Sequence, residues 1–442
     1  MTQDMTQGKI MPMLVHFTIP LVLGNLFQLT YNAVDSIIVG HFVGKEALAA
    51  VGICNPITTL FILFLNGLCM GASILIGMYY GAKEEEEKLA RQMSTTMLAG
   101  LVFSLVLTLV CIFFSPQILK FMQVDLSILN VTTTYLQIIF AGLVFTFLYN
   151  FFASTLRALG DSKSPLYFLI ISSILNIFGD LFFVVVLHAG SKGCAISTVI
   201  SEALCCLFCI LYIQKKVPLL QLGKKWLVFD ISLLKRTIAY GWASAMQQAT
   251  VQLGKLGIQM IVNTMGVSVV AAFTAVNRID DFAYTPEQNI AHSMTALMAQ
   301  NKGAGNNNRM QEGFRCGMVL EFIYGIFIFL VCFIFAKPLM CLFVQDEEVI
   351  MHGVTYLHLI SIMYILPAFT NGIQGFFRGI GDLKITLISS LVNMTVRVIV
   401  AAPLVFSLHL GIEALPYSYL AGWIGMLVAE LPLLIRTYKA YE

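Results

Sequence analysis

The chain has 442 residues, of which 58% are hydrophobic and only 11% are charged. Soluble domains carry about 25% charged residues, so this composition excludes a soluble globular protein and indicates a chain solvated by lipid. The net charge of +2 gives no information about nucleic-acid binding, because the basic residues are spread over many short loops.

The apolar stretches predict twelve membrane spans, each long enough to cross about 30 Å of hydrocarbon. The first stretch begins near Met13 and is too long for a signal peptide. The predicted spans lie near residues 14–41, 49–80, 92–114, 129–156, 165–188, 193–214, 237–264, 268–300, 312–336, 348–377, 385–408 and 412–436. We therefore expect an all-α, multi-pass membrane protein.

The distribution of Lys and Arg predicts the orientation of these spans. An even number of spans places both chain ends on one side, and nineteen Lys and Arg residues fall on that side. Only four fall on the other side, namely Lys45, Lys120, Lys192 and Lys337. Because cytoplasmic loops are enriched in Lys and Arg, we expect cytoplasmic N- and C-termini.

The second half of the chain repeats the first. TLRALGDSKSPL at 155–166 matches FFRGIGDLKITL at 376–387, which pairs Asp161 with Asp382 at an offset of 221 residues. Asp125 and Asp346 are separated by the same offset, as are Ser197 and Ser418. Six spans per repeat preserve the orientation, so the repeats are parallel.

This repeat predicts two six-helix lobes, residues 1–213 and 237–442, joined by a cytoplasmic linker at 214–236. Two such lobes that face a shared cavity and rock between inward and outward openings are the physical expectation.

The sequence lacks the motifs that are typical of enzymes, metal sites, ATP-binding proteins and channels. The seven histidines are scattered, the ten cysteines lack a second ligand pair, and there is no Gly-rich phosphate loop. No re-entrant filter segment of a channel is evident either. We therefore expect neither an enzyme nor a metal or cofactor site, no use of ATP and no nucleic-acid partner, which leaves a secondary transporter.

Two carboxylates interrupt the apolar spans of the first lobe. Asp35 lies in LTYNAVDSIIVG and Asp180 in LNIFGDLFFVVV, both in the outer third of the membrane, with Thr198 at a similar depth. Tyr31 and Asn176 precede the two acids by one helical turn.

Two carboxylates in a small apolar pocket do not both ionise cheaply, so we expect them to hold an exchangeable proton. The alternative ligand is Na⁺, held by a rigid cage of Asp35, Asn176 and Asp180. A structural alternative also stands, in which each acid hydrogen-bonds a helix break while Tyr31 and Thr198 only pack.

The second lobe carries a different set of charges. Lys255 falls where the repeat brings Asp35, and Arg397 faces Asp180 if SSILN at 172–176 is matched to SSLVN at 389–393. The predicted eighth span adds Asp280, Asp281 and Glu287, which we expect to face a substrate cavity and attract cations. In the alternative reading, Lys255 extends outward and Arg278 pairs with Asp281.

The order and spacing of five motifs resemble the multidrug and toxic compound extrusion (MATE) family over nearly the whole chain. They are FTIPLVLGNLFQLTYNAVDSIIVGHFVGKEALAAVGI, IGMYYGAK, RALGDSKSP, GCAISTVIS and ALMAQNKGAGNNNR. The resemblance implies a V-shaped pair of six-helix lobes that exports cationic and amphipathic compounds in exchange for H⁺ or Na⁺.

Within the family the chain resembles the DinF-like bacterial branch. The site that this branch implies matches Tyr31, Asp35, Asn176, Asp180 and Thr198. Carboxylates that NorM-like members place on helices 7 and 10 have no evident match. Glu287, in YTPEQNI, resembles a Pro-Glu position on helix 8 of MepA-type pumps.

These observations together predict a bacterial inner-membrane antiporter that works by alternating access. We expect export of organic cations or amphiphiles in exchange for H⁺, coupling at Asp35 and Asp180, a hinge at Pro20, and a monomer in the lipid bilayer. A Na⁺-coupled exporter and a flippase for a lipid-linked amphiphile remain open. The flippase is expected to need a more cationic cavity than Lys255, Arg278 and Arg397 provide.

Overall fold

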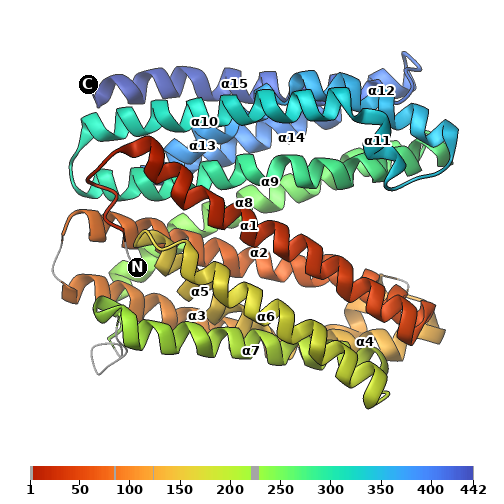
Figure 1. Cartoon of the computed structure of the whole chain (residues 1–442), viewed down its shortest axis with the longest axis horizontal. Helices are drawn as coiled ribbons and strands as arrows, with labels where there is room; N and C mark the ends of the chain where they lie inside the picture. Colours follow the sequence, from red (N-terminus) through yellow and green to blue (C-terminus); the bar gives the residue numbers. More distant parts are fainter. Residues whose placement is uncertain (1–2, 84–85, 123, 221–227, 442) are drawn as a thin grey trace. The chain divides into compact units, whose positions relative to one another are not determined.

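The computed structural model describes residues 3–83, 86–122, 124–220 and 228–441, and these form helices and no strand (Figure 1). Residues 221–227 of the predicted linker lie outside the described residues. The first half contains α1 (Ile10–Ile38), η1 (Val39–Val43), α2 (Lys45–Gly81), α3 (Glu86–Phe121), α4 (Leu126–Ala141), α5 (Leu143–Ala158), α6 (Lys163–Leu181), η2 (Phe182–Val186), α7 (Gly190–Lys216) and η3 (Pro218–Leu220). The second contains α8 (Ile231–Val262), α9 (Val267–Gly303), α10 (Asn307–Ile334), α11 (Ala336–Cys341), α12 (Glu347–Met363), α13 (Ile365–Gly379), α14 (Leu383–Phe406) and α15 (Ala414–Ala440).

Among the described residues, eight helices are long and apolar enough to cross a membrane. The pairs α4–α5 and α12–α13, bent by 41° and 48°, bring the number to ten. The remaining two of the twelve expected spans correspond to α8 and α9, which have 32 and 37 residues but carry more polar side chains. Helix α9 buries many of these side chains, including Asp280, Glu287 and Asn289, so it is a span whose polar face is covered by protein.

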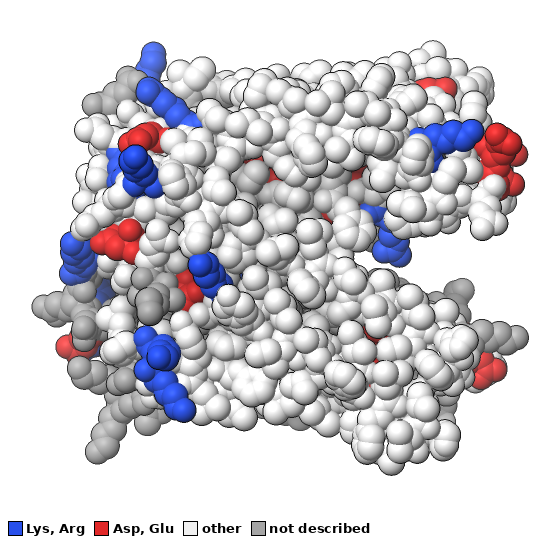
Figure 2. All heavy atoms as spheres, viewed as in Figure 1, with Lys and Arg blue, Asp and Glu red and all other residues white. Residues whose placement is uncertain are grey.

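The chain divides into two compact units, each with its own apolar core. Unit 1 comprises Met1–Asp4 and Ile19–Ala245, and unit 2 comprises Met5–Thr18 and Met246–Glu442. Within each unit, Lys, Arg, Asp and Glu gather toward the helix ends, while the helix flanks are mostly uncharged (Figure 2). This is the surface expected of helices whose flanks face hydrocarbon. These units are defined by contacts between residues, whereas the predicted lobe boundaries at 213 and 237 are defined by the sequence repeat. The predicted boundaries therefore stay a prediction.

Two helices change unit along their length. Helix α1 passes from unit 2 to unit 1 between Thr18 and Ile19, next to Pro20, and α8 passes from unit 1 to unit 2 after Ala245. A helical proline removes one backbone hydrogen bond and weakens the helix locally. Pro20 therefore lies next to the point where α1 passes from one unit to the other, and its role as a hinge stays a prediction.

Close contacts fix the first part of α1 within unit 2 and the first part of α8 within unit 1. In unit 2, the hydroxyl of Thr18 donates to the Ser293 hydroxyl at 2.8 Å, and the Arg309 guanidinium donates to the carbonyls of Met5, Gln7 and Gly8. In unit 1, α8 approaches α2 so closely that a Cβ at Gly71 would lie 2.5 Å from the backbone nitrogen of Gly241. Glycines at this contact let the two backbones meet.

The two units use equivalent helix pairs. The contacts α2·α5, α3·α4 and α6·α7 of unit 1 recur in unit 2 as α9·α13, α10·α12 and α14·α15. The repeat extends to the helix caps: Asp125 accepts from the Ser127 N–H at 2.8 Å, and Asp346, 221 residues later, accepts from the Val349 N–H at 3.1 Å. Hydrogen bonds from Ser127 to its carboxylate hold the pKa of Asp125 below its ordinary value.

Candidate functional site

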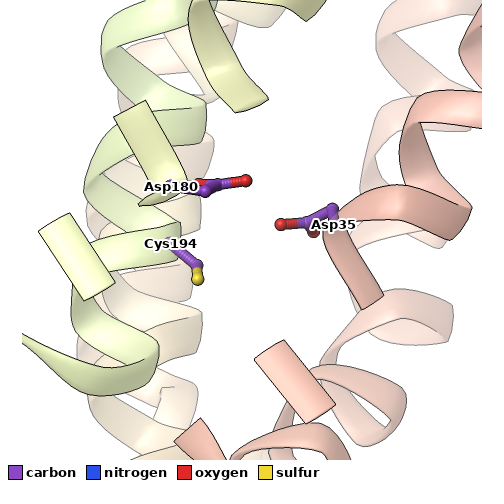
Figure 3. Close-up of side chains that lie close together, drawn as sticks. All are labelled: Asp35, Asp180 and Cys194. Carbon is purple, nitrogen blue, oxygen red and sulfur yellow. The ribbon is translucent and has the colours of Figure 1, made fainter. Parts of the chain in front are cut away.

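Helices α1, α6 and α7 of unit 1 bring two carboxylates and a thiol together. The carboxylates of Asp35 and Asp180 point toward each other, with the Cys194 thiol beside them (Figure 3). One ligand atom from each of the three residues lies within 4.8 Å of the other two. Asp180 has no exposed surface, and one oxygen of each carboxylate is buried without a hydrogen-bond partner among the described residues.

The negative charge of Asp35 and Asp180 requires compensation in this buried position. An ionised carboxylate within a membrane helix is costly, and two negative charges in contact repel each other. A proton held between Asp35 and Asp180 removes one of the charges and gives the unpartnered oxygens a donor. Two buried carboxylates in contact are thus stabilised by any cation that removes part of their negative charge.

Asn176 supports the pair from one turn away on α6. Its amide nitrogen lies 3.5 Å from Oδ1 of Asp180, 3.3 Å from the Ser197 hydroxyl and 3.5 Å from the Thr198 hydroxyl. These contacts are long, and the Asn176 Oδ1 atom has no partner among the described residues. The amide is thus placed to tighten its bond to Asp180 when the charge of that carboxylate changes.

Three further side chains surround the acids. Tyr31 of α1 interacts electrostatically with Asp35 and with Glu202 of α7, and Tyr135 of α4 interacts with both acids of the pair. Glu202 accepts a hydrogen bond of 2.6 Å from the Thr146 hydroxyl. Tyr31 therefore lies in the electrostatic field of the acid pair and of a third carboxylate.

Both acids are directly followed by π-helical turns. The turn η1 begins four residues after Asp35, and η2 begins two residues after Asp180. The two turns contact each other and α7. Single π-turns inside helices occur frequently at functional sites, where they change the direction of the side chains that precede them. The acid pair therefore lies where two helices depart from regular geometry.

The donors at this site do not form a uniform metal-ligand set. Carboxylate oxygens suit hard cations, whereas a thiol suits soft metals. Asp35, Asp180 and Asn176 offer oxygens to Na⁺, but the neighbouring Cys194 sulfur is a poor ligand for it. This mixture therefore does not match the usual ligand preference of a single class of metal ion.

Unit 2 has a cation where the sequence match aligns Asp180. The Arg397 guanidinium lies 3.8 Å from the ring centre of Tyr419 and 5.5 Å from that of Trp423. Arg397 also interacts electrostatically with Asp280, whose Oδ1 accepts a hydrogen bond of 2.5 Å from Tyr364. An aromatic cage thus holds this buried cation.

The other charges predicted for a substrate cavity fall into two groups. Asp281 and Lys255 both interact electrostatically with Asp280, and the Lys255 side chain is exposed. Glu287 is fully buried, with one oxygen 3.5 Å from the Asn371 amide and the other without a partner among the described residues. The electrostatic interactions of Asp280 therefore define one cluster, which also contains Asp281, Lys255 and Arg397. Glu287, seven residues further along α9, interacts with Asp280 as well.

Four residues near the acid pair were absent from the predicted site: Tyr135, Cys194, Ser197 and Glu202. Cys194 lies one helical turn before Thr198 on α7 and Ser197 lies directly before it, so closeness to a predicted residue within GCAIST was the available signal. Glu202 follows Thr198 by one further turn. Tyr135 lies on another helix, and only the packing of α4 against α7 brings it to the site.

Comparison with known proteins agrees with this architecture. The family model MatE matches twice, at residues 20–182 and 243–403. The chain belongs to the MatE family. The two matches fall on the two halves, which confirms the predicted duplication, the family resemblance and the twelve-helix, two-lobe fold class of MATE proteins.

Named MATE relatives cover nearly the whole chain. The "Probable multidrug resistance protein YoeA" of Bacillus subtilis is 29% identical over 100% of this chain and 95% of its own length. "Probable multidrug resistance protein YpnP" of the same species is 28% identical over 89% of this chain and 88% of its own length. A crystal structure of a MATE protein in complex with MaD3S matches with a TM-score of 0.92 at 21% identity, covering 99% of this chain and 98% of that one, which shows the common fold. The chain is thus a multi-pass member of a multidrug efflux transporter family.

Proposed function

We propose that the protein is a secondary antiporter that exports cationic or amphipathic organic compounds in exchange for H⁺. The observation that carries this proposal is the pairing of Asp35 and Asp180, which meet from α1 and α6 with one buried, unpartnered oxygen each. Membership of a multidrug efflux family supports the export of small organic compounds. No covalent chemistry is part of this function.

Coupling requires only that the proton and the drug favour different conformations. Protonation removes the charge from the Asp35–Asp180 pair and changes the hydrogen bond that the Asn176 amide offers. The π-turns beside the two acids and Pro20 in α1 give the helices local points at which to bend. A proton entering from outside thus favours one orientation of α1, and drug binding favours the other.

The substrate is proposed to bind near the acids of α9 in unit 2. The buried Asp280 and Glu287 and the half-buried Asp281 provide negative charge, while Tyr284, Trp423 and their aromatic neighbours provide ring surfaces. Organic cations are attracted by both features. The protein is proposed to act as a monomer in the bacterial inner membrane, with both termini in the cytoplasm, because Lys and Arg concentrate in the loops on that side.

Transport by purified protein in liposomes tests this proposal. Ethidium flux is measured under a pH gradient and, separately, under a Na⁺ gradient, for the wild type, Asp35→Asn and Asp180→Asn. We expect flux under the pH gradient in the wild type and its loss in both variants. Glu46→Gln, which changes an exposed acid in the first turn of α2, is the matched control and is expected to transport normally.

Other outcomes contradict specific parts of the proposal. Flux that requires a Na⁺ gradient would replace the proton by Na⁺ at the oxygens of Asp35, Asp180 and Asn176. Proton-driven flux that survives in both variants would remove the coupling role from the acid pair. Absence of flux of any cation under either gradient would favour a flippase, to be assayed with a lipid-linked substrate.

A further inference from the structure

Unit 1 contains a third carboxylate within its membrane-spanning helices, apart from the acid pair. Glu202 lies on α7, twelve residues after Gly190 and fourteen before Lys216, and hence near the middle of this span. Acidic side chains at such a depth are costly, and they commonly mark ion or proton pathways. Glu202 forms no ion pair with a Lys or Arg among the described residues, so its charge has no counter-ion there.

Glu202 lies on the side of α7 that meets the acid pair. Thr198 follows Cys194 by four residues, and Glu202 follows Thr198 by four more. Residues four apart on a helix are neighbours on one side of it, one above the other. Because Cys194 lies beside Asp35 and Asp180 (Figure 3), Glu202 lies on the same side of α7, roughly 12 Å further along the helix axis.

Contacts between α6 and α7 fix the depth of Glu202. The Asn176 amide, one turn from the acid pair, lies 3.5 Å from the Thr198 hydroxyl. One further turn along, the Ser172 hydroxyl of α6 donates to the carbonyl of Ser201 at 2.9 Å. Glu202 directly follows Ser201 in the chain. The polar groups therefore follow one another in the order acid pair, Asn176 with Thr198, and Glu202.

A hydroxyl from α5 holds the Glu202 carboxylate. The buried Thr146 hydroxyl donates to Oε2 of Glu202 at 2.6 Å, a length typical of a bond between a hydroxyl and an ionised carboxylate. A hydroxyl also accepts hydrogen bonds, so Thr146 can pair with the protonated carboxyl as well. The Glu202 side chain is half-buried rather than sealed off. The arrangement therefore supports both the ionised and the protonated form.

The titratable neighbours of Glu202 supply no compensating charge. Tyr31 of α1 and Cys205 of α7 interact electrostatically with it, and both side chains are largely neutral in water at pH 7. Other titratable groups on the elements packed against α7 interact elsewhere: Tyr135 of α4 with the acid pair, Tyr149 and Arg157 of α5 with Cys209, and Cys69 of α2 with Arg157, while η1 carries the exposed His41. Within the described part of the chain, a proton is thus the simplest way to remove the charge of Glu202.

The repeat shows that helix packing does not require this acid. At the 221-residue offset Glu202 corresponds to Trp423 of unit 2, a buried ring 5.5 Å from the Arg397 guanidinium. Thr146 corresponds to Pro367 at the same offset, so unit 2 has neither the carboxylate nor its hydroxyl donor. The hydrogen-bonded pair of Thr146 and Glu202 is therefore specific to the unit that carries the acid pair.

We propose that Glu202 is a second station on the proton path of unit 1, which takes the proton from the Asp35–Asp180 pair and releases it toward the cytoplasm. In this step the O–H bond at the pair breaks and a new one forms at Glu202, so the pair regains its negative charge and Glu202 becomes neutral. Loss of the proton to water then ionises Glu202 again. The hydroxyls of Tyr31 and Thr198, at the depth between the two stations, both donate and accept hydrogen bonds. The inference rests on the proposed H⁺ antiport.

Transport by purified protein in liposomes separates the proton step from drug binding. Exchange of radiolabelled for unlabelled ethidium without a gradient requires drug binding and reorientation but no proton transfer, whereas flux under a pH gradient requires all three. We expect Glu202→Gln to lower proton-driven flux about tenfold or more, while exchange stays within about twofold of the wild type. Glu202→Asp keeps a carboxylate and is expected to retain most of the proton-driven flux. Glu46→Gln, an exposed acid at the start of α2, is the control and should leave both activities normal.

The pH profile tests Glu202 without removing it. Thr146→Val deletes the hydroxyl that donates to the carboxylate, so the ionised form loses stabilisation and the proton is held more tightly. Proton release then requires a higher pH. We expect the rising limb of proton-driven flux, measured at a fixed pH difference across the membrane, to move to higher pH. Thr58→Val, which removes only a bond to the Cys54 carbonyl of its own helix, should leave the profile unchanged.

Three results would overturn the proposal. Normal proton-driven flux in Glu202→Gln would show that the proton does not pass through this carboxylate. An equal fall of exchange and of proton-driven flux would make Glu202 a drug-binding or structural residue. A lower flux in Thr146→Val without movement of the profile would give that hydroxyl a structural role alone. Size-exclusion chromatography verifies folding, and if Glu202→Gln aggregates, the profile of Thr146→Val decides the question.

Failure of this inference differs from failure of the proposed function. Absence of proton-driven flux in the wild type would overturn both. Proton-driven flux that is lost in Asp35→Asn and Asp180→Asn but normal in Glu202→Gln would leave the proposed antiport intact and remove only the second station.

Discussion

The two units share one architecture but differ in the charge they bury at matching positions. On α6, Ser172, Ser173, Asn176 and Asp180 are all buried, and on α14 the matched positions Ser389, Ser390, Asn393 and Arg397 are buried as well. Unit 1 ends this series with an acid that faces Asp35, and unit 2 ends it with a cation stacked on Tyr419.

Backbone geometry differs along with the charge. The π-turns η1 and η2 follow the two acids of unit 1, and no π-turn occurs in the described residues of unit 2. Unit 2 instead buries Glu287, Glu321 and Glu430 on three different helices. The helix pairing thus fixes where polar side chains are buried, and each unit's sequence decides which ions they attract.

The largest effect is expected from replacing the asparagine that occurs at matching positions of the two units, Asn176 in unit 1 and Asn393 in unit 2. Asn176→Leu removes the amide that contacts Asp180, Ser197 and Thr198, and we expect proton-driven ethidium flux to fall about tenfold or more, within the range of coupling energies. Asn393→Leu is the matched variant, since the amide nitrogen of Asn393 lies 3.2 Å from the Met426 sulfur and contacts no acid among the described residues. Equal loss of flux in both variants would mean that the asparagine serves packing in each unit.

An intermediate effect concerns the segment of α8 that belongs to unit 1. Gly71→Ala places a methyl group 2.5 Å from the Gly241 backbone nitrogen, so we expect a loss of about 1–3 kcal/mol in stability. Gly52→Ala, on the same helix, meets nothing within 4 Å and should stabilise by roughly 0.5–1 kcal/mol. Thermal unfolding in detergent, followed by circular dichroism, measures both. Similar midpoints for the two variants would show that the close contact between α2 and α8 contributes nothing.

The smallest effect concerns the segment of α1 that belongs to unit 2. Thr18→Val removes the buried hydrogen bond to Ser293 and should lower stability by about 1 kcal/mol. Thr30→Val, further along α1 in unit 1, removes only an exposed bond to the carbonyl of Leu26 and should have almost no effect. The same unfolding assay compares them. A larger loss for Thr30→Val would contradict the assignment of the buried anchor to the first part of α1.

The amino-acid sequence by itself determined the membrane class, the helical fold and the duplication. Lipid leaves a helix no partner for its backbone except itself, so long apolar stretches such as that of α3 identify spans without further information. The duplication follows from a constant offset, as between Asp161 and Asp382. The sequence also singled out Asp35 and Asp180, because an acid within an apolar stretch is conspicuous in a single helix.

Tertiary structure alone decided how side chains from different helices meet. No spacing along the chain predicts that Asp35 meets Asp180, that Arg397 stacks on Tyr419, or that Tyr31 interacts electrostatically with Glu202. The π-turns after the two acids and the change of unit along α1 and α8 were equally hidden. The physical reason is that local periodicity records which face of a helix is apolar, whereas the rotation and depth of each helix are set by its neighbours.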